Sequence, residues 1–186
     1  RRNIERLGAA RAFDAVVSDC GSCSARLKEY GDVLRDDPRY AEQAAGLARK
    51  ARSFSEFLVA LGLPGPLGEV RAGVTYHDPC HLSRRFAGVT AEPRALLARI
   101  PGLGYTELPE ADWCCGAAGS YTFLHHRQAI GVLDRKMGHV EGTGAGILAT
   151  ECPACMLHLA YGARRRGLPV SVRHVSQLLD QAQAGG

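Results

Sequence analysis

Five cysteines in the second half of the chain have the residue type and the spacing of a metal-binding site. Cys80 lies in HDPCHLSRR, Cys114 and Cys115 are adjacent in DWCCGAAGSY, and Cys152 and Cys155 form a CxxC pair in ATECPACMLHL. The three groups are evenly separated, with 33 residues between Cys80 and Cys114 and 36 between Cys115 and Cys152. Thiolates are soft ligands that suit iron–sulfur clusters and zinc alike. We therefore expect these five sulfurs to meet at one metal centre.

The number of thiols favours iron over zinc. A structural zinc ion is satisfied by four protein ligands, so a fifth convergent thiol requires either more than one metal atom or a separate role. An iron–sulfur cluster contains several metal atoms and is held by cysteine thiolates. The sequence therefore favours an iron–sulfur cluster, and zinc remains the alternative cofactor.

Two further cysteines, Cys20 and Cys23 in VVSDCGSCSARLKEYG, repeat only the closing CxxC of this pattern. We expect them to be the end of a second, truncated ligand set. The alternative interpretation is a pair of small buried residues. Disulfides are disfavoured because the total of seven cysteines is odd and because adjacent cysteines and CxxC pairs have poor disulfide geometry.

The composition is that of a globular protein. Hydrophobic residues make up 46% of the 186 residues and charged residues 23%, and no apolar run approaches the length of a membrane span. The net charge of +4 comes from scattered arginines, without a dense basic stripe or interleaved aromatic residues. We therefore expect a cytoplasmic protein that does not bind nucleic acid. The chain opens within a helical pattern, RRNIERLGAARAFD, so we expect it to be a C-terminal fragment.

Strand and helix patterns alternate along the chain, which predicts an α/β fold of parallel sheets with helices on both faces. Strands are predicted at residues 14–19, 70–78, 103–110, 144–151 and 168–175. Helices are predicted at residues 1–12, from Ser24 onward, at 38–62, 91–100, 117–142 with a break near its end, 155–167, and in the closing VSQLLDQA.

A segment rich in proline and glycine, LGLPGPLGE, is the predicted boundary between two structural units. We expect residues 1–66 to be the C-terminal part of a first unit and residues 67–186 to form a complete second unit.

The predicted strands place the cysteines together. Cys20, Cys80, Cys114 and Cys152 each follow a predicted strand and precede or begin a predicted helix. The carboxyl ends of parallel strands share one edge of a sheet, where α/β proteins bind their ligands. Helix N-termini at that edge stabilise thiolates through their unpaired N–H groups and partial positive charge. We therefore expect the thiols at the C-terminal edge of the strands.

Several polar residues near the cysteines admit more than one interpretation. His77 and His81 flank Cys80, where they are either hydrogen-bond donors and proton relays for the metal centre or structural residues of the turn. Asp78 is predicted to be a turn or cap residue. His125 and His126 lie within a predicted helix and are interpreted as surface residues.

The order of a cysteine, a long spacer, CCG, a second long spacer and CxxC resembles the cysteine-rich CCG domain. HDPCHLSR, ADWCCGAAGSY, GAGILATECPAC and RRRGLPVSVRHVSQLL are similar to the iron-sulfur subunit of glycolate oxidase, and the resemblance covers essentially the whole chain. The domain also occurs in lactate utilisation iron-sulfur proteins and in the B subunit of heterodisulfide reductases, usually as two tandem units. The resemblance implies a 4Fe-4S cluster, cubane or non-cubane, on the five cysteines. It also implies that Cys20 and Cys23 belong to the first of two tandem units.

The resemblance further implies electron transfer in an oxidoreductase complex. In the glycolate and lactate branch, the similar subunit passes on electrons from a flavin-containing subunit during oxidation of a 2-hydroxy acid. In the heterodisulfide reductase branch, the cluster reduces a disulfide directly. The complete CPAC ending departs from many glycolate-type members, which lack one of its two cysteines. The implied partners are a flavoprotein dehydrogenase and other redox subunits, with any membrane association peripheral and through those partners. A non-redox zinc-binding module is the alternative from a different class.

Overall fold

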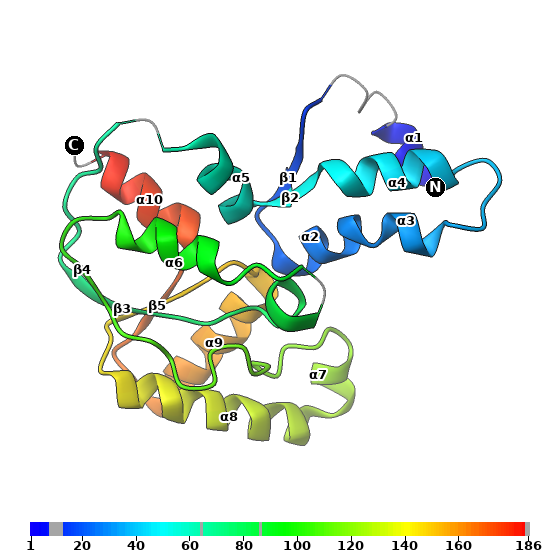
Figure 1. Ribbon diagram of the computed structural model, residues 1–186. Coiled ribbons are helices and arrows are strands. Elements are labelled where there is room, and N and C mark those ends of the chain that lie inside the picture. Colours follow the sequence, from blue (N-terminus) through cyan, green and yellow to red (C-terminus); the bar gives the residue numbers. More distant parts are fainter. Residues whose placement is uncertain (8–12, 64, 86, 185–186) are drawn as a thin grey trace.

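Two parallel β-sheets form the framework of the protein (Figure 1). The computed structural model describes residues 1–7, 13–63, 65–85 and 87–184. The larger sheet has the strand order β4-β3-β5-β6 and every neighbouring pair is parallel. Its strands are β3 (Ala72–Tyr76), β4 (Leu103–Tyr105), β5 (Ile147–Thr150) and β6 (Ser171–His174). The α/β prediction with parallel strands is therefore confirmed.

Helices cover both faces of the larger sheet, as the sequence predicted. Helices α6 (Ala91–Ala98) and α10 (Val175–Ala184) lie on one face, and α8 (His126–Thr143) and α9 (Pro153–Arg166) on the other (Figure 1). Successive residues of a strand point to opposite faces. Ala149 of β5 accordingly packs in the core under α6 and α10, whereas Leu148 packs in the core under α8 and α9.

The N-terminal region contains the smaller sheet, formed by β1 (Val16–Ser18) and β2 (Ala51–Ser53). Its helices are α1 (Arg2–Arg6), α2 (Gly21–Lys28), α3 (Tyr30–Val33), α4 (Ala41–Lys50) and α5 (Phe54–Leu61). A separate core of Ile4, Tyr40, Ala44 and Leu47 holds this region together.

Several hydrogen bonds join the N-terminal region to the carboxyl edge of the larger sheet. The Gly21 N–H donates to the Glu151 carbonyl at 2.7 Å, and the Ser55 hydroxyl donates to the Glu151 carboxylate at 2.7 Å. The His174 ring lies 2.8 Å from the Asp19 carbonyl oxygen. The α2 N-terminus is therefore fixed beside the end of β5, where the predicted metal centre lies.

The prediction of one helix over residues 38–62 is wrong. The segment contains α4, the short strand β2 and then α5. Ser53 ends the strand and starts α5 through a capping box, in which its hydroxyl accepts from the Glu56 N–H and the Glu56 carboxylate accepts from the Ser53 N–H. Parallel pairing of β2 with β1 supplies the backbone partners that a continuous helix would have supplied locally.

The predicted helix over residues 117–142 also differs in detail. Helix α7 (Tyr121–Leu124) and α8 are separated at His125, so the break lies near the start rather than near the end. Gly116 and Gly119 have positive φ, which delays the first helical turn. Near the C-terminus of α8, burial of Met137 and Val140 outweighs the low helix propensity of the glycines there.

The remaining predicted elements are present, with differences in their bounds, and one observed element was not predicted. Strand β4 is shorter than residues 103–110, and a π-helical turn, η2 (His81–Arg85), follows Cys80 without having been predicted. Residues 8–12 of the first predicted helix lie outside the described residues. No helix in the described part of the chain is both long enough and apolar enough to cross a membrane.

Candidate metal centre

The five predicted ligands lie on three segments beyond the carboxyl ends of the strands. Cys80 follows β3 at the start of η2, and Cys114 and Cys115 lie on the long loop between β4 and α7. Cys152 follows β5 and is the N-cap of α9, with Cys155 in the first turn of that helix. The predicted position of the cysteines at the C-terminal edge of the sheet is therefore confirmed.

The five sulfurs interact in a continuous chain, in the order Cys80, Cys114, Cys115, Cys155 and Cys152. Hydrogen bonds from Cys115 and Cys80 lower the pKa of Cys114 to about 2. A hydrogen bond from Cys155 lowers the pKa of Cys152 to about 4. The same contacts raise the pKa values of the three donor thiols. Residues far apart in sequence thus form one site that favours thiolate at two positions.

Backbone N–H groups point at these sulfurs. The Gly116 N–H lies 3.3 Å from the Cys114 sulfur, and the Ala117 N–H donates to the Cys115 sulfur, which partly offsets the rise in the pKa of Cys115. The Cys155 N–H, in the first turn of α9, donates to Cys152. Such N–H groups favour the charged form of a thiol. The loop after the cysteine pair and the N-terminus of α9 therefore prepare the sulfurs to bind a cation.

The CxxC pair formed by Cys20 and Cys23 lies beside the five-cysteine set. The Ser22 hydroxyl, between Cys20 and Cys23, is 3.6 Å from the Cys152 sulfur, and the Ser22 N–H also donates to that sulfur. Burial raises the pKa of Cys20 to about 11, with smaller contributions from Cys23 and Cys152. Cys23 is exposed. The N-terminal region thus contributes hydrogen bonds to the five-cysteine set while its own thiols stay outside the five-sulfur chain.

His77 is a buried residue whose ring nitrogen lies near two of the cysteine sulfurs and could act as a further ligand. One of its ring nitrogens and the sulfurs of Cys115 and Cys155 lie within 4.8 Å of one another. The ring is fully buried, and neither ring nitrogen has a hydrogen-bond partner among the described residues. Burial lowers the pKa of His77 to about 3, so the ring is neutral.

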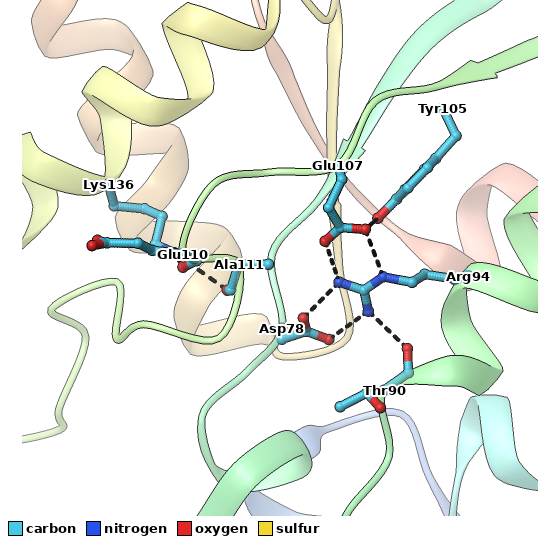
Figure 2. Close-up of polar contacts among 8 residues, drawn as sticks. All are labelled: Asp78, Thr90, Arg94, Tyr105, Glu107, Glu110, Ala111 and Lys136. Carbon is cyan, nitrogen blue, oxygen red and sulfur yellow. Dashed lines mark hydrogen bonds and ion pairs between the residues drawn. The ribbon is translucent and has the colours of Figure 1, made fainter.

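Two cations position the loops that carry the cysteines (Figure 2). Arg94 of α6 binds the Asp78 carboxylate through two hydrogen bonds of 2.9 and 2.7 Å, and it binds the Glu107 carboxylate through two of 2.9 and 2.6 Å. Asp78 lies two residues before Cys80, so this ion pair ties the Cys80 loop to the segment after β4. Asp78 was predicted to be a simple turn or cap residue, and its bidentate ion pair with a side chain 16 residues away was missed.

Lys136 of α8 anchors the other cysteine loop. Its ammonium group donates to the backbone carbonyls of Glu110 and, at 3.2 Å, Ala111, shortly before Cys114 (Figure 2). The Lys136 side chain is 1% exposed. Burial lowers its pKa, and the electrostatic effect of Cys115 opposes that shift. A buried cation near a set of thiolates offsets their negative charge.

The donor set fits an iron–sulfur group. Five converging thiols exceed the four ligands of a structural zinc ion. A buried polar atom without a partner costs roughly 1–3 kcal/mol, so a group bound beside Cys115 and Cys155 would also relieve the unpaired ring nitrogens of His77. Glycine at position 116 lets the loop after the cysteine pair approach α8 and α9 closely, since a Cβ there would lie 2.5 Å from the Ala129 carbonyl oxygen and 3.1 Å from the His158 ring.

Sequence patterns identified the sulfurs but missed several residues that support them. Ser22, Arg94 and Lys136 belong to helices whose surface patterns are ordinary, and what distinguishes them is contact with residues far away in the sequence. A lysine at a core-facing position of a helix, as at Lys136, was the one clue available in the sequence. His125 and His126 are exposed, as predicted.

The fold and the thiols together define a cysteine-rich α/β protein whose clustered thiols lie at the carboxyl edge of a parallel sheet. Residues 74–160 match the family "CCG: Cysteine-rich domain", and the chain belongs to this family. It is 39% identical over 173 residues to the "Probable glycolate oxidase iron-sulfur subunit" of Bacillus subtilis, a match that covers 91% of this chain and 39% of the relative. The chain thus spans about two fifths of that relative's length.

Shorter relatives align over a larger share of their length. The chain is 35% identical over 168 residues to "Lactate utilization protein A" of Lysinibacillus sphaericus, which covers 90% of this chain and 73% of the relative. It is 34% identical over 175 residues to the protein of the same name from Halalkalibacterium halodurans. That match covers 94% of this chain and 71% of the relative. The predicted resemblance to the glycolate oxidase and lactate utilisation proteins is therefore confirmed.

Proposed function

We propose that the protein is an iron–sulfur subunit that transfers electrons in the oxidation of a 2-hydroxy acid, glycolate or lactate. The observation that carries this proposal is the convergence of five thiols from three separate segments on one site. The names of the similar proteins support the substrate class.

The five converging cysteines are the proposed ligands: Cys80, Cys114, Cys115, Cys152 and Cys155. An iron–sulfur group held by them would accept and donate single electrons. The chain's own residues set the conditions for that exchange. Gly116 and the N-terminus of α9 direct N–H groups at the sulfurs, and Lys136 is a buried cation that interacts with Cys115. All three favour the extra negative charge of a reduced group over its oxidised form.

The electrons would come from a flavoprotein dehydrogenase, because two-electron oxidation of a hydroxy acid must be divided into single-electron steps before an iron–sulfur group can carry it. We assign residues 67–186 to the unit that holds the proposed ligands. Residues 1–66, with Cys20 and Cys23, are assigned to the end of a preceding unit of the same kind. Their contacts with Glu151 and Cys152 support a role in completing the second unit's site.

The test is metal analysis of protein purified without oxygen. We expect a brown protein with visible absorption from thiolate-to-iron charge transfer and with stoichiometric iron and acid-labile sulfide. A colourless protein that contains one zinc per chain would overturn the proposal. Co-purification of a flavoprotein that reduces the bound iron when glycolate or lactate is added would support the substrate class, and reduction only by a dithiol would contradict it.

A further inference from the structure

The buried ring of His77 has no hydrogen-bond partner, among the residues that the structure describes, that accounts for its position. The residue follows β3, and its backbone N–H donates to the Ala149 carbonyl at 2.9 Å, which fixes the side chain in the interior. Its exposure is 0%, and neither ring nitrogen makes a hydrogen bond with any described residue. A neutral imidazole carries one N–H donor and one lone pair, and burial of both without partners is costly. Something outside the protein chain is expected to meet at least one of them.

The surroundings of the ring indicate what that partner is. One ring nitrogen lies within 4.8 Å of the sulfurs of both Cys115 and Cys155, yet it forms no hydrogen bond with either. Bonds of about 2.1 Å to nitrogen and about 2.3 Å to sulfur place two donors on one metal atom roughly 3.5 Å apart. Small rotations of these three side chains would therefore be enough to bring all of them onto one metal atom.

The other roles considered for His77 lack support in the contacts. A proton relay needs hydrogen-bonded neighbours along which a proton moves, and the ring has none among the described residues. A structural histidine would be held by a side chain or carbonyl. The Ala111 carbonyl lies close enough to influence the ring but not in hydrogen-bond geometry. A ligating histidine commonly directs its second N–H at such a carbonyl.

We propose that His77 supplies a nitrogen ligand to the iron–sulfur group at Cys115 and Cys155, so that the site combines thiolates with one imidazole. This inference rests on the proposed function. A neutral imidazole adds no negative charge to the site, so the reduction potential is higher than it would be with a thiolate at the same position. The ligand set therefore contains a residue outside the five-cysteine pattern.

The direct test is pulsed electron paramagnetic resonance on the anaerobically purified protein, in both its oxidised and reduced states. We expect a strong nitrogen hyperfine coupling that changes when the protein is labelled with ¹⁵N-histidine. The coupling should disappear in His77→Gln and persist in His158→Gln. His158 is a matched control because it is also buried, with an unpaired Nε2 that faces Gly116. If neither redox state is paramagnetic, iron X-ray absorption gives the same answer through the presence or absence of a nitrogen shell.

A second measurement separates ligation from a purely structural role. We expect His77→Ala to lower the affinity for iron by about tenfold or more, and His77→Cys to restore the iron content. The restored protein should have a lower reduction potential than the wild type, because a thiolate replaces a neutral ligand. Folding of each variant is checked by circular dichroism.

The outcomes distinguish this inference from the proposed function. Iron-loaded wild-type protein with no histidine nitrogen coupling and no nitrogen shell would overturn the role of His77 and leave the iron–sulfur function intact. Coupling that survives His77→Gln would do the same. Wild-type protein that takes up no iron would overturn the proposed function itself.

Discussion

The two CxxC turns of this protein share their local geometry but differ in their surroundings. In each, the first cysteine is the N-cap of a helix and has an extended backbone, with φ −120° and ψ 113° at Cys20 and φ −144° and ψ 115° at Cys152. Cys23 is exposed, whereas Cys155 is buried. Burial raises the pKa of Cys20 to about 11, whereas the Cys155 thiol lowers the pKa of Cys152 to about 4.

This difference shows that the CxxC turn alone does not make the site. A strand, a cysteine N-cap and a helix are sufficient to produce the turn, and they occur in both regions. Among the described residues, the second turn joins the chain of thiols carried by the Cys80 loop and by the loop with Cys114 and Cys115, whereas Cys20 has only Cys23 and the Cys152 sulfur near it. Those loops are held by Arg94 and Lys136 respectively. The chemical state of a CxxC pair therefore depends on the loops packed around it.

The largest expected effect comes from removing a sulfur at the centre of the chain of thiols. Cys115 is 1% exposed and interacts with both Cys114 and Cys155. We expect Cys115→Ser to abolish iron binding, because a hydroxyl is a poor ligand for iron–sulfur iron and the hydrogen-bonded chain is cut. Iron and sulfide content after anaerobic purification measures the effect.

The matched control is Cys23→Ser in the other CxxC turn, where the side chain is exposed. It should retain the iron bound at the five-cysteine site. Equal iron loss in both variants would mean that both CxxC turns contribute to one metal centre. It would contradict the conclusion that only the second turn belongs to the five-cysteine site.

The sequence was sufficient to predict the framework of the second region. Period-two and helical patterns located β3, β5, β6 and the helices between them, because buried parallel strands are short apolar runs bounded by glycine and proline. It was less successful for the region with the first turn. The apolar pattern of residues 38–62 matches a helix throughout, and only pairing with β1, which lies far away in sequence, turns Ala51–Ser53 into a strand.

The candidate site could be predicted only as far as its sulfurs. Their spacing is visible in the sequence, whereas the buried positions of His77 and Lys136 result from packing between elements that are far apart. The bond between Asp78 and Arg94 joins a loop to a helix, and neither residue type is unusual in its local sequence. Long-range pairs of this kind have no local pattern from which to predict them.

The second prediction compares glycines beside the two cysteine groups. Gly116 has φ 93°, and a Cβ there would meet the Ala129 carbonyl oxygen at 2.5 Å. We expect Gly116→Ala to lower the free energy of unfolding by about 2–4 kcal/mol, from backbone strain and the clash together. Urea denaturation of the metal-free protein measures the loss.

Gly21, in the first CxxC turn, is the corresponding control. It lies in α2 with φ outside the left-handed region, and a Cβ would meet the Glu151 carbonyl oxygen at 3.2 Å. Alanine also favours the helix by roughly 0.5–1 kcal/mol, so the net loss for Gly21→Ala should be about 1 kcal/mol. If Gly21→Ala lowered the free energy of unfolding as much as Gly116→Ala, the packing of Gly21 against Glu151 would be as tight as the packing of the loop after Cys115.

The third prediction concerns the hydrogen bonds that cross between the two turns. The Ser22 hydroxyl lies 3.6 Å from the Cys152 sulfur. Hydrogen bonds to the sulfurs of an iron–sulfur group stabilise its reduced form. With a contribution of about 1 kcal/mol, Ser22→Ala should lower the reduction potential by about 40 mV. A redox titration monitored by visible absorption measures this shift.

Ser24→Ala is the control for this substitution. Ser24 lies on the same helix and is buried, but its hydroxyl donates to the Ser18 carbonyl rather than to a sulfur. Its potential should equal that of the wild type. A potential unchanged in Ser22→Ala would mean that the first turn only packs against Cys152 without tuning it.

The smallest expected effect concerns how α2, and with it the first turn, is anchored. Lys28 at the end of α2 lies 2.6 Å from the carboxylate of Glu56 in α5, and both side chains are about one fifth exposed. Burial raises the pKa of Glu56, but the ion pair with Lys28 and the Ser53 N–H outweigh it and hold the pKa below 4.5. A depressed carboxyl pKa stabilises the fold above its unfolded value, and this stabilisation is lost as the pH falls through the folded value.

We therefore expect the free energy of unfolding to fall by about 1 kcal/mol more in wild type than in Glu56→Gln as the pH is lowered from 6 through the folded pKa of Glu56. Urea denaturation across this range measures the difference. Glu29→Gln is the control, because its partner Arg26 is largely exposed and the pair spans one helical turn. If Glu56→Gln kept the full acid sensitivity of the wild type, the anchoring of α2 would have to come from its hydrogen bond to Glu151 and from core packing alone, since neither of these changes as Glu56 gains a proton.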